Sequence, residues 1–394
     1  MTADIYAEMD QKADSPATML DELVNFLRQE NRPEEMFEAM KMRTRQELGL
    51  PLITLGDDPP QSDAVENQLE HGLLDACRAA GEMIMKQGRV SAAWMYLRPT
   101  GDLELARKLI AKVPITDENY DDIVQVLLHE GVDVRRGFQA VLKHQGTCNS
   151  ITLFEQALAN QSKKDRRAAA EALLDHFYDE LSANVRGDIS RRTAPADPGE
   201  SLLDMITKRP ELLSQGAYHA DTTHIASTVQ IAKLVDTPER LTKAWELTQY
   251  GRRLDRNFQY PGDEPFVDFY PAFATFYSVL LGRDVEAGLT LFRRKAEQVD
   301  PMSEGTAAIE TYVDLLQRSG REVEAIEAMA KLVPDQVPPQ RIVPLMMEIV
   351  EDLESTPDAS AIVQAARDRV AEFCQSRGDV LGYAAARLRR STND

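Results

Sequence analysis

The feature that most constrains the fold is a pair of apolar stripes within residues 304–334. Apolar side chains recur there at steps of three and four residues on both sides of Ser319 and Gly320. They are Ile309, Val313 and Leu316 before the turn, and Val323, Ile326, Met329, Ala330 and Val333 after it. This spacing places residues on one face of a helix, so the stretch predicts a helical hairpin. Neither helix can bury its stripe alone, so the hairpin needs similar neighbours stacked on it.

The charge balance narrows the classes of partner. The 394-residue chain has 45 basic and 65 acidic side chains, a net charge of -20. A surface of that sign repels phosphate backbones and anionic lipid headgroups. We therefore expect a basic protein or peptide as partner, and neither nucleic acid nor a membrane. Length alone fits either two or three domains or one long array.

Cysteine usage and the amino terminus bear on the compartment. The three cysteines are odd in number and lie far apart in sequence, which argues against a disulfide framework. The first residues have neither a basic start nor an apolar run, and no stretch of about 18 apolar residues occurs. The sequence therefore predicts a cytoplasmic protein.

Breaks in the helical pattern suggest the domain organisation. Residues 1–63 form an acidic segment with a disordered start, a helical pair opening at Pro16 and Pro33, and a Pro-rich linker. Residues 64–190 read as an array of helical hairpins. Residues 191–200 break every periodicity and indicate a linker, after which 201–394 form a second array. Strand signals are nearly absent, so the prediction is an all-α fold.

Small residues recur at fixed offsets around the predicted turns. Gly81, Gly88 and Ala93 are separated by seven and five residues, with Gly88 at a turn between helices. Glycine and alanine let two helices approach closely, and a glycine suits a left-handed helix end. The five-residue offset recurs at Gly101 and Ala106, Gly282 and Ala287, and Gly320 and Ala325, the last two within the similar segments GRDVEA and GREVEA.

This pattern resembles the tetratricopeptide (TPR) repeat, a family of helical hairpins. The resemblance covers about half of the chain, including the hairpins of 273–334. It departs from the family because no steady 34-residue period is kept and most aromatic positions are missing. What it implies is a right-handed α-α superhelix of stacked antiparallel hairpins with little or no β-sheet. It carries no ligand-binding residues over to this chain.

The segment from Tyr218 to His224 is the sharpest candidate for chemistry. His219, Asp221 and His224 are ligand types for a divalent metal such as zinc or iron, and a loop entering a helix can bring them together. The competing interpretation is a helix start, with Asp221 as the N-cap. The spacing of the two histidines also departs from the i, i+4 arrangement of helix-borne zinc motifs.

A second candidate is the pair His144 and Cys148. A cysteine at a helix start can have its thiolate stabilised by exposed amide groups, with a nearby histidine as base. The alternative is a small residue next to an ordinary cap at Asn149 or Ser150. Tyr218 is a third group that could assist such chemistry. His176 also neighbours acidic residues, but its position beside an apolar stripe predicts a core histidine.

The aromatic segment 252–270 has two interpretations. Phe258, Tyr260, Phe266 and Phe269 alternate with charged residues, as in an irregular loop that lines a cleft. Alternatively, the segment covers the end of a helical layer with its aromatic side chains pointing inward. We favour this second interpretation.

Two functions of different classes follow. The first is a non-enzymatic interaction or scaffold protein that needs no cofactor and binds a peptide or protein segment in the concave groove of the array. The second is a helical enzyme with a site in residues 144–270, where His219, Asp221 and His224 hold a metal and Cys148, His144 or Tyr218 assists. Phosphate-binding loops, dinucleotide fingerprints, CxxC pairs and GxSxG elbows are missing from the sequence.

Overall fold

The described part of the chain is entirely helical. The computed structural model describes residues 5–12, 14–53, 61–193, 195–301, 303–357 and 359–388. Within these ranges the regular elements are the helices α1 to α19 and five short 3-10 or π turns, with no β-strand. The predicted all-α class is therefore confirmed. Across the same ranges, no helix combines the length and apolar character that crossing a bilayer requires.

The chain divides into two compact units, which are described separately. The N-terminal unit comprises Met1–Ser150 and Gln156–Ala169, and the C-terminal unit comprises Ile151–Glu155 and Ala170–Asp394. The division falls within α8 (Val134–Ala157) and α9 (Lys163–Arg192). The sequence places its strongest break later, at 191–200. In the structure that segment follows α9, and Arg186 of α9 donates to the carbonyl of Asp197 at 2.7 Å.

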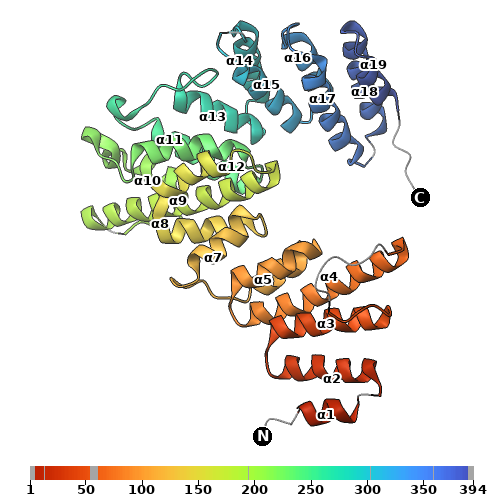
Figure 1. Cartoon of the computed structure of the whole chain (residues 1–394). Helices are drawn as coiled ribbons and strands as arrows, with labels where there is room; N and C mark the ends of the chain where they lie inside the picture. Colours follow the sequence, from red (N-terminus) through yellow and green to blue (C-terminus); the bar gives the residue numbers. More distant parts are fainter. Residues whose placement is uncertain are drawn as a thin grey trace. The chain divides into compact units, whose positions relative to one another are not determined.

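Helices of the N-terminal unit follow one another closely along the chain. Those before α8 are α1 (Ile5–Gln11), α2 (Pro16–Gln29), α3 (Pro33–Glu47), α4 (Asp63–Lys86), α5 (Val90–Leu97), α6 (Leu103–Ile110) and α7 (Tyr120–Val124). Consecutive helices pack together, α2 on α3, α3 on α4 and α4 on α5 (Figure 1). The starts of α2 and α3 at Pro16 and Pro33 are as predicted. Helix α1 occupies a stretch expected to be disordered, and residues 54–60 of the predicted linker lie outside the described ranges.

Close packing of α4 on α5 depends on the small residues noted in the sequence. A Cβ atom on Gly81 would lie 2.6 Å from Cγ of Leu97 and 3.3 Å from the carbonyl oxygen of Ala93. Gly88, in the turn between these helices, has a φ of +78°, the left-handed conformation that glycine adopts without strain. The predicted roles of Gly81, Gly88 and Ala93 in this hairpin are thus confirmed.

Two apolar clusters of described residues contribute to the core of the N-terminal unit. One joins α2, α3 and α4, and the other joins α4 and α5 to α6 and the helical turn near residue 126. Burial of this kind stabilises by about 25 cal/mol for each Å² of apolar surface removed from water. Each of these two clusters spans at least three helices, so the helices in it depend on packing against one another for stability.

The C-terminal unit continues the pattern of helices packed in sequence order. After α9 it contains α10 (Leu202–Lys208), α11 (Thr222–Ile231), α12 (Pro238–Gly251), α13 (Phe269–Leu280), α14 (Val285–Gln298), α15 (Ala307–Arg318), α16 (Glu322–Leu332), α17 (Pro339–Glu354), α18 (Ser360–Ser376) and α19 (Val380–Arg387). From α11 to α19 each helix packs on the next (Figure 1). Helices α15 and α16 form the hairpin predicted for 304–334, with Ile309, Leu316, Ile326 and Met329 buried.

Aromatic side chains fill the middle of this unit. Phe266 stacks on Phe273 of α13 with ring centroids 3.9 Å apart, and Phe276 and Phe292 surround them. Phe266 comes from the irregular segment that precedes α13. The inward-facing interpretation is therefore correct for Phe266 and Phe269, which are both buried.

Arginine side chains link helices through backbone carbonyls in both units. In the N-terminal unit Arg136 donates to the carbonyl oxygens of Ile110 and Val113 at 2.6 and 2.8 Å. In the C-terminal unit Arg318 donates to the carbonyl of Lys233 at 2.7 Å, and Arg367 to that of Leu388 at 2.9 Å. A helix end leaves carbonyls without internal partners, so these guanidinium groups satisfy them across the junction.

Candidate functional site

The predicted site residues are divided between the two units. His144 and Cys148 belong to the N-terminal unit, and Tyr218, His219, Asp221 and His224 to the C-terminal unit. Among the described residues, no group of three or more His, Cys, Asp or Glu side chains is arranged to hold a metal ion. The metal hypothesis for residues 219–224 thus gains no support from the geometry and stays a prediction.

Asp221 caps the helix that the sequence predicted. Its carboxylate accepts a hydrogen bond from the backbone N–H of Thr223 at 2.8 Å, at the start of α11. The side-chain and backbone hydrogen bonds from Thr223 lower the pKa of Asp221 below its ordinary value. The cap interpretation is therefore confirmed. A carboxylate in this position accepts hydrogen bonds from the exposed amide groups of the first turn and interacts favourably with the positive end of the helix dipole.

His219 is held from both sides of its ring in a buried position. Its Nε2 lies 3.2 Å from Oδ2 of Asp188 on α9, and its Nδ1 lies 2.9 Å from the hydroxyl of Tyr250 on α12. The backbone N–H of His219 also donates to that hydroxyl at 2.9 Å. A neutral ring fits this pattern, with Nε2–H donating to Asp188 and Nδ1 accepting from Tyr250.

The environment favours that neutral ring. Burial lowers the pKa of His219, although the neighbouring Asp188 opposes the shift. Burial also acts on Asp188, but hydrogen bonds from His219 and Arg192 outweigh it and keep the pKa of that carboxyl below its ordinary value. His219 therefore joins α9 and α12 through its two ring nitrogens. His224, in the first turn of α11, is only half-buried.

The other predicted residues have separate surroundings. Tyr218 is exposed, with its ring edge-on to Phe258 at 5.2 Å. His144 lies against the ring of Tyr120 at 4.4 Å, and its Nδ1 is 3.7 Å from Asp117.

The helix around Cys148 differs from the prediction. Helix α8 passes through Gly146 with a single non-helical residue, so Cys148 lies in the first turn after a kink rather than before a helix start. Its side chain is exposed. His176, expected in the core, is instead exposed, with Nε2 3.9 Å from Glu180. His176 and Phe177 are neighbours on the helix, so their side chains point in different directions and only Phe177 lies on the buried face.

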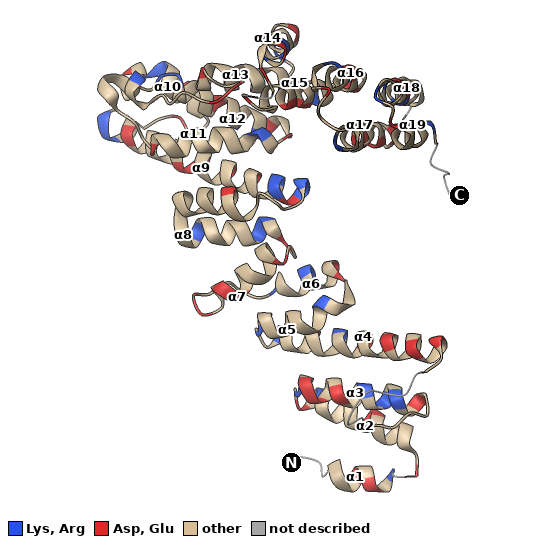
Figure 2. Ribbon diagram, turned by 45° about the horizontal axis from the view of Figure 1, so that its top comes forward, with Lys and Arg blue, Asp and Glu red and all other residues tan. Residues whose placement is uncertain are grey.

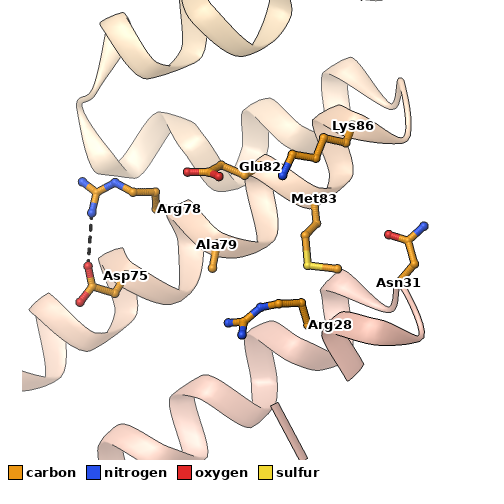
Figure 3. Close-up of a pocket in the computed structure, with 8 residues that line it drawn as sticks. All are labelled: Arg28, Asn31, Asp75, Arg78, Ala79, Glu82, Met83 and Lys86. Atoms are coloured by element: carbon orange, nitrogen blue, oxygen red, sulfur yellow. Dashed lines mark hydrogen bonds and ion pairs between the residues drawn. The ribbon is translucent and has the colours of Figure 1, made fainter. Parts of the chain in front are cut away.

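A pocket that sequence reasoning missed lies in the N-terminal unit. It has a volume of about 480 Å³ and occurs where the end of α2 faces the second half of α4. Its lining is Arg28, Asn31, Asp75, Arg78, Ala79, Glu82, Met83 and Lys86. In Figure 3 Met83 points from α4 toward the helix that carries Arg28, and it provides apolar surface together with Ala79.

Charges of both signs surround this apolar surface. Arg78 pairs with Asp75 at 3.2 Å, as the dashed line in Figure 3 shows. Glu82 and Lys86 have no ion-pair partner among the residues that the structure describes. The sequence did contain a signal, because residues 75, 78, 82 and 86 recur at helical spacing along α4. That signal could not show which neighbouring helix faces the stripe.

The comparisons with known proteins identify no family for this chain. Its TPR resemblance therefore rests on the small residues and the hairpin order, and what can be stated is an all-helical protein with consecutive helices packed together. No family model, curated protein or solved structure matches this chain.

Proposed function

We propose that this protein is an interaction or scaffold module, a TPR-like array of helical hairpins that binds a peptide or protein segment. The observation that carries the proposal is the pocket between α2 and α4. These are the first helices of two successive hairpins, α2–α3 and α4–α5. In a stack of hairpins the first helices line one continuous surface, and an extended segment can bind along it.

The chemistry of the pocket suits a peptide better than a small metabolite. Ala79 and Met83 offer apolar surface, and a methionine side chain adapts to differently shaped partners. Charged groups surround that surface, as at protein interfaces with an apolar centre and a polar rim. Glu82 can pair with a basic side chain of the segment and Lys86 with an acidic one. Together with the net charge of -20, this supports a basic protein partner whose bound segment carries mixed charges.

The test starts with selection of peptides from a random display library on the full chain. The affinity of selected peptides is then measured by fluorescence polarisation for the wild type, Met83→Ala and Lys86→Glu. We expect binding to weaken about tenfold for Met83→Ala, because the change removes about 1.5 kcal/mol of apolar contact between the methionine and the peptide.

Met95→Ala is the matched control, since Met95 lies on α5 outside the pocket and is exposed. It should leave the affinity unchanged. Selected peptides that bind the pocket variants as tightly as the wild type would refute the assignment of the pocket. A selection that yields no binding peptide would refute the proposed function itself.

A further inference from the structure

The pocket beside α4 is bordered by two charged side chains that do not pair with each other. Glu82 and Lys86 are four residues apart on α4, the spacing at which a glutamate and a lysine commonly pair on a helix surface. One turn earlier, Arg78 and Asp75 do form such a pair, at 3.2 Å. In the part of the chain that the structure describes, no ion pair joins Glu82 to Lys86, and no dashed line links them in Figure 3. Both charges can therefore pair with a bound molecule.

Basic side chains on α4 occur only where the helix lines this pocket. The first half of the helix carries acidic residues and no lysine or arginine, and Figure 2 shows them in red. Arg78 and Lys86 are the two basic residues of the helix, and both line the pocket. A purely basic segment would pair with Glu82 but be repelled by Lys86. A segment with charges of both signs is therefore the better complement to this surface.

The size of the pocket bears on the conformation of that segment. Its lining on α4 runs from Asp75 to Lys86, a rise of about 16 Å along the helix. A bound α-helix of that length, about 10 Å wide, would fill roughly 1,300 Å³, whereas the pocket has a volume of about 480 Å³. An extended segment rises about 3.3 Å per residue, so about five residues span the same length. An extended segment therefore places a larger share of its atoms in the pocket than a helix does.

The spacing of the two charges also matches an extended chain. Glu82 and Lys86 are separated by a rise of about 6 Å along α4. In an extended segment, neighbouring side chains on the same face are two residues and about 6.6 Å apart. A basic and an acidic residue two positions apart can therefore face Glu82 and Lys86 at the same time. Met83 lies between these two residues in the sequence and offers apolar surface to the same segment.

We infer that this pocket selects extended segments in which a basic and an acidic residue are two positions apart, the basic one pairing with Glu82 and the acidic one with Lys86. The inference rests on the proposed function, and it adds the conformation and the charge pattern of the bound segment. Arg28, across the pocket, donates to Asn25 of its own helix at 3.1 Å. Lys86 is therefore the cation that we assign to the acidic residue.

Charge reversals in the peptide and in the protein test the two pairings. The probe is a fluorescein-labelled peptide from the selection on the full chain, and fluorescence polarisation measures its affinity. Changing its basic residue to glutamate should weaken binding to the wild type about tenfold, because an attraction becomes a repulsion. Glu82→Lys should restore the affinity of that peptide to within about threefold of the original. A peptide whose acidic residue is changed to lysine should be rescued in the same way by Lys86→Glu.

Glu70→Lys is the matched control, because it makes the same change of charge on α4 outside the pocket. It should rescue neither peptide. The inference is overturned if either rescue fails, if the selected peptides lack the charge pattern, or if they become helical on binding, as circular dichroism would show. In those cases the proposed function still stands where Met83→Ala weakens binding. A selection that yields no binding peptide refutes the proposed function, and this inference with it.

Discussion

Substituting Gly81 by alanine sets two opposite effects against each other. Within the helix, alanine is more favourable than glycine by about 1 kcal/mol. The added Cβ, however, would lie 2.6 Å from Cγ and 2.8 Å from Cδ2 of Leu97. Leu97 is only 1% exposed, and the carbonyl of Ala93 at 3.3 Å limits movement on the other side. The methyl group therefore cannot be accommodated without displacing packed atoms.

The balance is expected to be destabilising. Overpacking a core costs typically about 1–3 kcal/mol, and a contact this short belongs near the upper end of that range. After subtracting the gain in helix propensity, Gly81→Ala should lower the free energy of unfolding by about 1–2 kcal/mol. Urea unfolding followed by circular dichroism measures the difference as a shift in the midpoint.

Gly187 provides a control of opposite sign. It lies inside α9, and a Cβ placed on it would meet no atom within 4 Å. Gly187→Ala should therefore stabilise by about 0.5–1 kcal/mol through helix propensity alone. Combining Gly81→Ala with Leu97→Ala should remove the penalty of the first change, since the clashing atoms are gone. A neutral or stabilising Gly81→Ala in the wild-type background would refute this account of how α4 and α5 pack.

Three further predictions concern the C-terminal unit. Arg367→Met should destabilise the α18–α19 hairpin by about 3 kcal/mol, because charged hydrogen bonds to buried carbonyls and to Glu354 are lost. Faster amide hydrogen exchange in α19 should report this loss of stability. Arg369→Met is the control, because Arg369 lies on the surface and its loss should change the stability little. Because the folded-state pKa of His219 lies below its unfolded value, the unfolded chain takes up the proton more readily, so stability is fully present above about pH 6.5 and falls as the pH drops. Chemical unfolding between pH 7 and 5, about the range in which free histidine titrates, should show this loss in the wild type and in His224→Gln, and less of it in His219→Gln. Added Zn²⁺ should leave the thermal midpoint unchanged because both ring nitrogens of His219 are engaged; a rise that the double change His219→Ala and His224→Ala abolishes would favour the metal hypothesis.

Local signals explain how much of the fold could be read from the sequence. The prolines at 16 and 33 set helix starts, and the turn at Gly320 joins two helices, because each depends on a few neighbouring residues. The kink at Gly146 was harder to predict than these boundaries, because a helix can continue beyond one non-helical residue when packing holds both halves in place. Sequence periodicity shows that a helix has a buried face. It does not show how exposed the residues next to that face are, which is why His176 was misplaced.

The candidate site could be predicted only in part for a related reason. The capping role of Asp221 is local, and it was visible in the sequence. The partners of His219 were not, because Asp188 and Tyr250 each lie 31 residues away on other helices. The pocket beside Met83 likewise depends on which helices meet, and that is a property of the packed unit rather than of α4.

The arginines that bridge helix junctions have a consequence for behaviour in acid. A guanidinium group keeps its proton throughout the accessible pH range, and a peptide carbonyl does not titrate. The contacts of Arg136 with Ile110 and of Arg318 with Lys233 are therefore insensitive to acidity, whereas the hydrogen bond that Nδ1 of His219 accepts from Tyr250 is lost when that nitrogen takes up a proton. Mild acidification should loosen the segment that leads into α11, while the helices on either side of that segment stay folded.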